Sequence, residues 1–405
     1  MQDLLFLAQR IPYPPDKGDK IRSFHVLEDL NRHYRVHLGC FIDDPADWQH
    51  LPTLRQMVAS CRVLPISRRH ATLRSTRALL NGAPMSVPYY FDRRMAEWVD
   101  ALMTRIRPSS AYLFSSQMAQ YVMKGQRPDR VIMDFVDVDS QKWRHYADGR
   151  KWPLAPVYRR ESRTLLAFER KVARFADASV FVSKPERDLF RSLAPESASR
   201  IHAISNGIDA DYFSPDRDYP IPFDRTHPTL VFTGAMDYWP NVEAICWFAA
   251  KVLPLLRQAH PDARLLIVGG NPTSDVIALG AIAGVTVTGR VPDVRPYIAH
   301  ADAIIAPLLT ARGIQNKVLE GMSMAKPVVA TSQAHEGIDA EPGHHLIVAD
   351  GAVDFAAAVG RAITDPRSVA IGLAARARVR QIYAWEPQLA RLRGLIQDET
   401  QLKVA

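Results

Sequence analysis

Short apolar runs alternate with stretches of helical periodicity along most of the chain, and this alternation constrains the fold more strongly than any other feature. Strands that alternate with helices form a parallel sheet covered by helices, so the sequence predicts an α/β fold. The predicted strands are residues 4–8, 36–41, 61–66, 111–114, 131–133, 179–182 and 201–204 in the first half, and residues 229–232, 263–268, 285–288, 303–306 and 328–330 in the second.

One segment rich in Asp and Pro, residues 209–226, interrupts the alternation and is predicted to be an interdomain linker. A chain of 405 residues also exceeds what one hydrophobic core supports. We therefore expect two Rossmann-like domains with parallel sheets, residues 1–208 and 209–384, which face each other because ligands bind beyond the carboxyl ends of the strands. The pattern after Asp354 predicts a helical tail, in which residues 385–405 form a helix that packs back toward the first domain.

The composition is that of an ordinary globular protein, with 47% hydrophobic and 23% charged residues. The three cysteines lie far apart without CxxC spacing, which argues against a zinc site or a disulfide framework and indicates a reducing compartment. No uncharged apolar segment reaches the ~18 residues of a membrane-spanning helix. The N-terminal apolar run is too short for a signal peptide, so we expect a cytoplasmic protein.

Positive charge is concentrated in the first half. Residues 1–215 carry 33 Lys and Arg against 24 Asp and Glu, whereas residues 216–405 carry 18 against 19. This asymmetry fits an anionic partner, either a membrane face or a phosphorylated acceptor, or simply a solvated surface. Nucleic acid is not expected because no binding motif accompanies the charge. The basic amphipathic segment 68–80 is compatible with peripheral contact to an anionic bilayer, although an ordinary solvated helix is the favoured interpretation.

The segment 312–322 carries the sharpest chemical signal, because it follows a predicted strand and begins a helix. A helix N-terminus presents unpaired N–H groups and a positive dipole end, which suit a phosphate. Lys317 and Glu320 share one face of this helix. We assign Arg312 and Lys317 as the cations that stabilise a diphosphate leaving group, and Glu320 as the acceptor of two ribose hydroxyls. The alternative is a surface salt bridge between Lys317 and Glu320.

Two further groups of candidates lie in the first half. Gly18 and Asp19 follow the first strand, where a glycine lets backbone approach a ligand, although a plain turn would also explain them. Asp134, Asp137 and Asp139 follow a later strand, where carboxylates can act on hydroxyl protons. Either Asp137 or Asp139 is a candidate for contact with the sugar or acceptor, and Asp139 could equally cap the next helix.

Residues 312–331, followed by 334–337, resemble the donor-site signature of glycosyltransferase family 4. Residues 204–209 and 212–215 are similar to the interdomain signature of that family, and residues 233–241 resemble the first turn of its second domain. Residues 134–143 and 18–22 narrow the resemblance to bacterial sugar transferases associated with PEP-CTERM/exosortase exopolysaccharide loci. The resemblance runs essentially from end to end of the chain.

This resemblance implies a GT-B fold and sugar transfer from a nucleotide-diphosphate sugar with retention of configuration, without a metal or other cofactor. It places the phosphate and sugar beside Gly18, and the base beside Gly289 and Val291. The remaining donor-binding positions that it implies are Gly234, Gly313, Ile314, Gln315 and Asn316. We expect a lipid-linked acceptor, such as a polyprenyl-phosphate-linked glycan, or a polysaccharide intermediate, at the inner face of the cytoplasmic membrane.

The sequence departs from this family at three places. Arg312 occupies the position where relatives often have a first Glu, the turn 234–237 lacks their Arg and Lys, and no His occurs between residues 131 and 142. A non-catalytic nucleotide-sugar-binding subunit stays as an alternative because the first Glu and the His are absent. A nucleotide-sugar 2-epimerase stays as another because it shares the two-domain architecture. A nicotinamide dehydrogenase is disfavoured because the chain contains no G-x-G-x-x-G.

Overall fold

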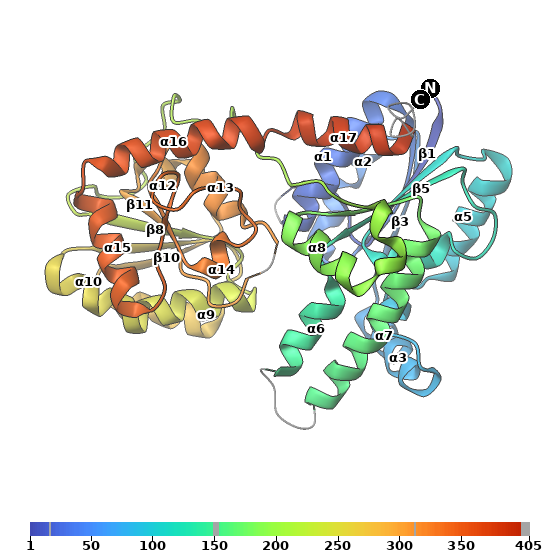
Figure 1. The fold of residues 1–405 in the computed structure, drawn as a ribbon, viewed down its shortest axis with the longest axis horizontal. Coiled ribbons are helices and arrows are strands. Elements are labelled where there is room, and N and C mark those ends of the chain that lie inside the picture. The colour runs from blue at the N-terminus through green and yellow to red at the C-terminus, as the bar shows by residue number, and fades with distance from the viewer. Residues whose placement is uncertain (16–17, 149–153, 312, 398–405) are drawn as a thin grey trace. The chain divides into compact units, whose positions relative to one another are not determined.

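The computed structural model describes residues 1–15, 18–148, 154–311 and 313–397. The chain forms two compact units. The first unit consists of the residues up to Ser205 together with the segment from Pro387 onward, and the second unit runs from Asn206 to Glu386. Each unit contains one parallel β-sheet with helices packed on both of its faces, so the α/β prediction is confirmed (Figure 1).

The sheet of the first unit has the strand order β3-β2-β1-β4-β5-β6-β7, and every neighbouring pair is parallel. Its strands are β1 (Asp3–Ala8), β2 (Arg35–Ile42), β3 (Ser60–Pro65), β4 (Ser110–Phe114), β5 (Arg130–Val136), β6 (Ala178–Phe181) and β7 (Ile201–Ala203). Its helices are α1 (Gly18–His33), α2 (Leu51–Met57), α3 (Arg68–Asn81), α4 (Ser86–Tyr89), α5 (Arg93–Arg105), α6 (Asp139–Asp148), α7 (Leu154–Phe175) and α8 (Lys184–Leu193).

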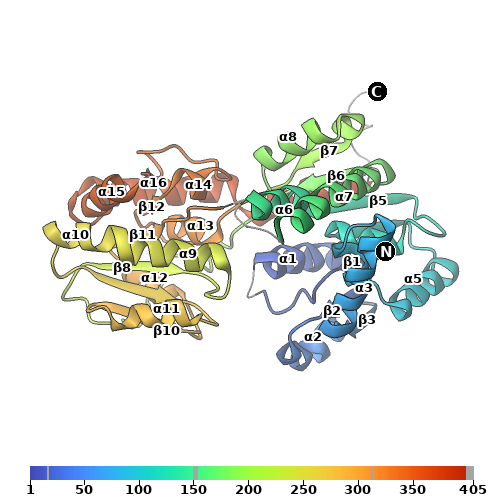
Figure 2. The same ribbon diagram turned by 90° about the horizontal axis from the view of Figure 1, so that it is seen from below.

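The sheet of the second unit has the order β10-β9-β8-β11-β12-β13 and is also parallel throughout. Its strands are β8 (Thr229–Thr233), β9 (Arg264–Val268), β10 (Val285–Gly289), β11 (Ala303–Ala306), β12 (Val328–Ala330) and β13 (Ile347–Val348). Its helices are α9 (Trp239–Trp247), α10 (Leu253–Ala259), α11 (Ser274–Ala278), α12 (Arg295–His300), α13 (Asn316–Ser323), α14 (Ser332–His335), α15 (Ala352–Thr364) and α16 (Arg367–Ile382) (Figure 2).

Burial explains why the predicted strands appear as continuous apolar runs. Helices cover both faces of a parallel sheet, so its central strands must be apolar on both sides. Every residue of β4, β8, β11 and β12 is buried, whereas the edge strands β3 and β10 are partly exposed. Strand β13, which the sequence did not predict, is a half-buried pair of residues at the opposite edge.

The segment predicted as a linker is part of the second unit. The backbone oxygen of Phe213 accepts hydrogen bonds from the hydroxyl of Ser323 on α13 and from the buried guanidinium of Arg376 on α16. Arg376 also pairs with Asp216. The segment therefore packs against two helices of that unit and does not run free between domains.

The last helix, α17 (Trp385–Gln397), begins in the second unit and belongs to the first from Pro387 onward. Its buried apolar stripe includes Leu389, Leu392 and Leu395. Arg393 on this helix forms a salt bridge with the buried carboxylate of Asp29 on α1. The final helical segment of the chain thus completes the hydrophobic and ionic packing of the first unit.

Candidate functional site

In the second unit, residues 307–315 leave the carboxyl end of β11 and lead into helix α13. Its N-cap is Gln315, whose side chain makes no capping hydrogen bond to the helix. The N–H groups of the first turn and the positive end of the helix dipole therefore lie at the sheet edge where parallel α/β proteins bind ligands. Val318, Leu319 and Met322 are buried against the unit's core and fix the helix in this position.

Lys317 lies in the first turn of α13, and only 7% of its surface is exposed. Its Nζ donates a hydrogen bond to Oδ1 of Asn241 at 2.5 Å and lies 4.4 Å from the centre of the Phe232 ring. Burial lowers the pKa of Lys317 to about 7, against the opposing effect of the Glu320 carboxylate. Burial likewise raises the pKa of Glu320 to about 7, against the opposing effect of Lys317.

These two groups are therefore poised to change protonation near neutral pH. In the part of the chain that the structure describes, they interact through their charges but do not form a direct salt bridge. A surface ion pair, the alternative considered for them, does not describe a lysine that is buried and held by Asn241. An anion that approached Lys317 would favour its charged form.

Three glycines bring the ends of β8, β9 and β10 close together beside this lysine. A Cβ atom on Gly234 would lie 2.7 Å from Nδ2 of Asn241 and 3.4 Å from Nζ of Lys317, and a Cβ atom on Gly269 would lie 1.7 Å from the oxygen of Gly234. The N–H of Gly269 donates to the oxygen of Gly289, which has φ 68°. A side chain at Gly234 or Gly269 would collide with neighbouring atoms, so the close approach of these strand ends requires glycine.

The other donor-site candidates of the second unit flank this edge. Gly313 has φ 66°, and a Cβ atom on Gly337 would lie 2.2 Å from its oxygen, so these two backbones approach closely. Ile314, Gln315 and Asn316 lead from Gly313 into α13 and are partly buried. Val291, which follows β10, is also partly buried. Arg312, assigned as a second cation, lies outside the described residues.

In the first unit, the two candidate carboxylates at the end of β5 are held by one lysine. Lys142 Nζ lies 2.9 Å from an oxygen of Asp137 and 2.9 Å from an oxygen of Asp139. Burial alone would lower the pKa of Lys142, but the two carboxylates raise it well above its usual range. The second oxygen of Asp137, Oδ1, is buried and has no hydrogen-bond partner. It is therefore an acceptor available to a donor such as a hydroxyl.

The backbone at this point is strained. Val136 has φ 70°, which a β-branched residue rarely adopts, and the N–H of Asp137 bonds back to the oxygen of Phe135. Ser115, at the end of the neighbouring strand β4, has φ 75°, and its N–H donates to the oxygen of Asp134. Strain of this kind concentrates at functional sites, where the surrounding structure maintains it.

A buried ion pair, which the sequence did not reveal, supports the same strand end. The guanidinium of Arg22 on α1 donates to Asp134 at 2.7 Å and to the backbone oxygen of Ile204 at 2.9 Å. Tyr112 on β4 also donates to Asp134. Of the three aspartates near the end of β5, Asp134 is therefore engaged in structural contacts, which leaves Asp137 and Asp139 as the candidates.

Glu169 on α7 is a second functional candidate that the sequence did not indicate. It is fully buried, and its Oε1 accepts a hydrogen bond from the backbone N–H of Ser140 at 3.2 Å. Its Oε2 has no hydrogen-bond partner. Burial, together with the charge of Asp139, raises the pKa of Glu169 to about 8, so it is protonated at neutral pH. No local sequence signal marks it, because thirty residues separate it from Asp139.

The first turn of α1 contains Gly18 and Asp19. Asp19 forms a 2.6 Å salt bridge with Arg10, which also pairs with Asp43 at the end of β2. Lys20 is buried and pairs with Asp47 at 2.9 Å. The charges of this turn are therefore engaged within the first unit, and a donor-binding role for Gly18 and Asp19 stays a prediction.

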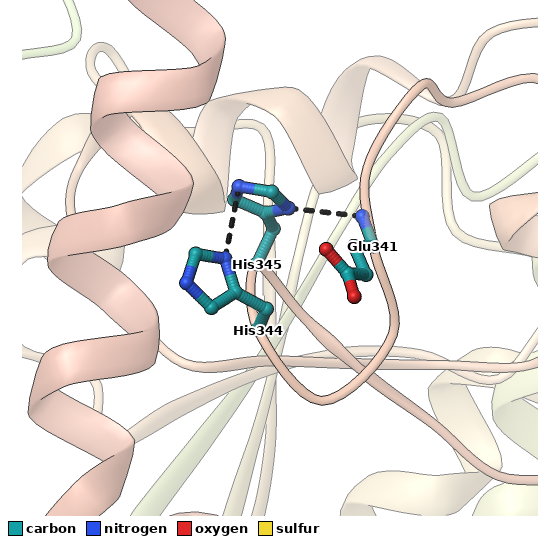
Figure 3. A group of neighbouring side chains, drawn as sticks. All are labelled: Glu341, His344 and His345. Atoms are coloured by element: carbon teal, nitrogen blue, oxygen red, sulfur yellow. Dashed lines mark hydrogen bonds between the residues drawn. The ribbon is translucent and has the colours of Figure 1, made fainter.

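One cluster within the described ranges has the side-chain types of a metal site: Glu341, His344 and His345, in the loop before β13 (Figure 3). The N–H of Glu341 donates to Nδ1 of His345 at 2.9 Å, and Nε2 of His345 lies 3.2 Å from Nδ1 of His344. Nε2 of His345 therefore carries the proton and donates to His344. Both nitrogen lone pairs that a metal would need are used by these hydrogen bonds.

Comparisons with known proteins find that the chain is similar to glycosyltransferases. Residues 227–365 match the family model described as glycosyl transferases group 1. The chain is 28% identical over 275 residues to a GDP-mannose-dependent alpha-(1-6)-phosphatidylinositol monomannoside mannosyltransferase of Mycolicibacterium smegmatis. This alignment covers 63% of this chain and 69% of that protein. A second relative is the GDP-mannose-dependent monoacylated alpha-(1-6)-phosphatidylinositol monomannoside mannosyltransferase of Corynebacterium glutamicum. It is 25% identical to this chain in an alignment that covers 61% of this chain and 67% of that protein.

Two solved structures share the fold over nearly the whole chain. A sucrose-phosphate synthase from Thermosynechococcus elongatus superposes with a TM-score of 0.73 at 17% identity, covering 99% of this chain and 100% of that one. HepE from Anabaena, solved in complex with UDP and glucose, gives a TM-score of 0.70 at 15% identity, covering 98% and 100%.

Proposed function

We propose that this chain, a glycosyltransferase with the GT-B fold, belongs to glycosyltransferase family 4. It transfers a sugar from a nucleoside-diphosphate sugar with retention of configuration. The acceptor is a lipid-linked or polysaccharide intermediate of exopolysaccharide synthesis. The reaction takes place on the cytoplasmic side of the membrane. The mannosyltransferases among the relatives act on phosphatidylinositol mannosides, which supports a lipid-linked acceptor.

The observation that carries the proposal is the buried lysine at the N-terminus of α13. As the glycosidic bond of the donor breaks, the nucleoside diphosphate gains about one negative charge, which a preorganised cation stabilises. Lys317 is held in place by Asn241, beside a carboxyl edge of the sheet that is lined by glycines. Because its pKa is about 7 without ligand, a bound diphosphate raises that pKa and keeps the lysine charged.

The other candidates take supporting roles. Glu320 accepts hydrogen bonds from the ribose hydroxyls, while Gly289 and Val291 hold the base through their backbone. Gly313 and the first N–H groups of α13 contact the diphosphate. Asp137 orients the sugar or acceptor through its unpaired Oδ1, and Lys142 holds the carboxylate in place through its other oxygen.

A turnover assay with the purified full chain tests this proposal. UDP- and GDP-sugars are first screened by thermal shift, because a donor at 100 times its dissociation constant stabilises the protein by about 2.7 kcal/mol. With the donor so identified, we expect Lys317→Ala to lower turnover at least ~100-fold, as the loss of one preorganised charge contact does. Lys251→Ala removes an exposed lysine of the same unit and is the matched control.

An unchanged rate in Lys317→Ala would remove Lys317 from the mechanism. Release of free sugar at the full rate without any acceptor would instead favour a nucleotide-sugar 2-epimerase. Donor binding without turnover under any condition would favour a binding subunit.

A further inference from the structure

A pocket in the first unit is not used by any of the donor-site candidates. Its volume is about 170 Å³, and it lies at the carboxyl ends of β2 and β3, where Phe41 and Pro65 contribute to its lining. The start of α3 and the connection from α4 to α5 form the rest of the wall. In parallel α/β sheets this edge is the one that binds ligands.

Arginines outnumber acidic residues among the side chains that line the pocket. Arg74, Arg94 and His70 line it, and among its described lining residues Asp92 is the one carboxylate. Asp92 is already paired with Arg94 at 2.8 Å, and hydrogen bonds from Arg94, with the charge of Arg74, hold its pKa below the usual range. Arg74 therefore keeps a positive charge that no salt bridge in the described chain neutralises.

Arg74 is also fixed in position. Its Nε donates to the backbone oxygen of Pro88 at 3.1 Å, and its Nη2 donates to that of Tyr89 at 3.3 Å. These bonds use one edge of the guanidinium and anchor it to α4. The remaining nitrogen, Nη1, can donate to a ligand. A charged donor that is anchored before binding loses little conformational entropy when the ligand arrives.

The beginning of α3 adds further hydrogen-bond donors. Ser67 is the N-cap residue, but its hydroxyl bonds to Nδ1 of His70 at 2.8 Å and makes no capping bond to the helix backbone. The N–H groups of the first turn thus keep their capacity to bind an anion. The same bond orients the imidazole ring of His70, whose Nε2 is a further hydrogen-bonding atom at this end of the helix.

Aromatic side chains line the same pocket. Phe91 is 40% exposed and stacks on Tyr121, with ring centroids 6.1 Å apart and an interplanar angle of 7°. The Tyr121 hydroxyl accepts from the N–H of Asp92 at 2.7 Å and donates to the backbone oxygen of Tyr90, which fixes the loop that carries Phe91. Apolar ring faces suit the C–H face of a sugar or the carbon atoms next to a phosphate ester.

We infer that this pocket is an acceptor subsite that binds a phosphate ester, with the phosphate at Arg74, His70 and the start of α3 and the adjoining carbon skeleton on Phe91 and Tyr89. The inference rests on the proposed function, because it concerns the acceptor of that reaction. The ester could belong to a soluble sugar phosphate or to a phospholipid headgroup, which share this chemistry.

Binding measurements on the full chain distinguish these cases. Glucose 6-phosphate, glucose and inorganic phosphate are titrated by calorimetry, and vesicles of phosphatidylcholine with or without 30% phosphatidylinositol are tested by co-sedimentation. Arg74→Gln and His70→Gln are compared with Arg93→Gln, which removes an arginine on α5 that is 87% exposed and does not line the pocket. Circular dichroism verifies that each variant is folded.

We expect a phosphate ester, in the soluble or the vesicle arm, to bind at least tenfold more tightly than its unphosphorylated counterpart. Both pocket variants should weaken that binding at least tenfold, while Arg93→Gln leaves it unchanged; the arm that binds identifies the source of the phosphate. Equal binding of glucose and glucose 6-phosphate with no preference for phosphatidylinositol, or equal effects of all three variants, would overturn the inference. Donor nucleotide titrated in parallel reports on the proposed function separately.

Discussion

At the residue scale, the candidate sites are distinguished by ionisable side chains that the fold buries without full compensation. Lys317 and Glu320 in the second unit both have a pKa of about 7, and Glu169 in the first unit has a pKa of about 8. Burying a charged group is costly unless it is paired, so such groups are retained where they serve a purpose. Glu169 lies against the backbone of Ser140, next to the carboxylate pair that Lys142 holds.

The buried carboxyl of Glu169 predicts a specific dependence of stability on pH. Its folded pKa of about 8 exceeds the unfolded value of about 4.5, so the folded state binds the proton more tightly. Stability therefore falls as the pH rises from about 4.5 to about 8 and levels off above that. Glu169→Gln should remove this contribution, whereas Glu97→Gln, on an exposed part of α5, should keep it. Melting temperatures between pH 5 and 9 that fall in parallel for all three proteins would refute the assignment.

At the level of helices and strands, the strands could be predicted from the sequence. Helices cover both faces of each sheet, so most strands consist of consecutive apolar residues. The twelve predicted strands are all present, and most of their bounds shift by only one or two residues. Strand β13 could not be predicted in this way, since two half-exposed residues at a sheet edge have no apolar pattern.

The donor-side candidates were predictable because Lys317 and its neighbours follow one another along a single strand-to-helix connection. The supporting residues were not. Asn241 reaches Lys317 from α9, Arg22 reaches Asp134 from α1, and Glu169 reaches Ser140 from α7. These contacts join positions far apart in sequence, and only the packing of the elements brings them together.

The glycine turns at the carboxyl edge of the second sheet should tolerate no side chain where two backbones approach closely. Gly269→Ala would place a methyl group 1.7 Å from the backbone oxygen of Gly234, which no side-chain rotation can relieve. We expect a loss of about 2 kcal/mol or more, since overpacking against backbone is among the costly substitutions. Gly280→Ala meets no atom nearer than 3.9 Å and should change stability by less than about 0.5 kcal/mol. Urea denaturation of both variants makes the comparison, and equal midpoints would contradict it.

At the scale of the whole molecule, the chain consists of two units, and the first is completed only by the end of the chain. Residues after Pro387 belong to it although the entire second unit intervenes in the sequence. Leu392 on α17 is fully buried, and Arg391 donates to the backbone oxygen of Ala203 at 3.0 Å, at the end of β7. The packing of the first unit therefore includes residues from both of these segments of the chain.

From this arrangement we expect a destabilising substitution in α17 to affect the first unit. Leu392→Ala should cost about 2–5 kcal/mol, as the truncation of a buried leucine does. Because the contacts of Leu392 belong to the first unit, hydrogen exchange should accelerate within residues 1–205 and not within 206–386. Leu373→Ala, which alters a leucine on α16 that is 60% exposed, is the control. Acceleration confined to the second unit would contradict the assignment of α17.

Proton uptake on nucleotide binding reports whether Lys317 contacts the diphosphate of the donor. At pH 8 a lysine with a pKa of about 7 is about nine-tenths neutral, and a bound diphosphate raises its pKa and draws in a proton. UDP and GDP are titrated calorimetrically at pH 8 in two buffers of different ionisation enthalpy. We expect uptake of about one proton per nucleotide in the native chain and its loss in Lys317→Met. Nucleotide binding with the same proton uptake in both proteins would show that Lys317 does not contact the diphosphate.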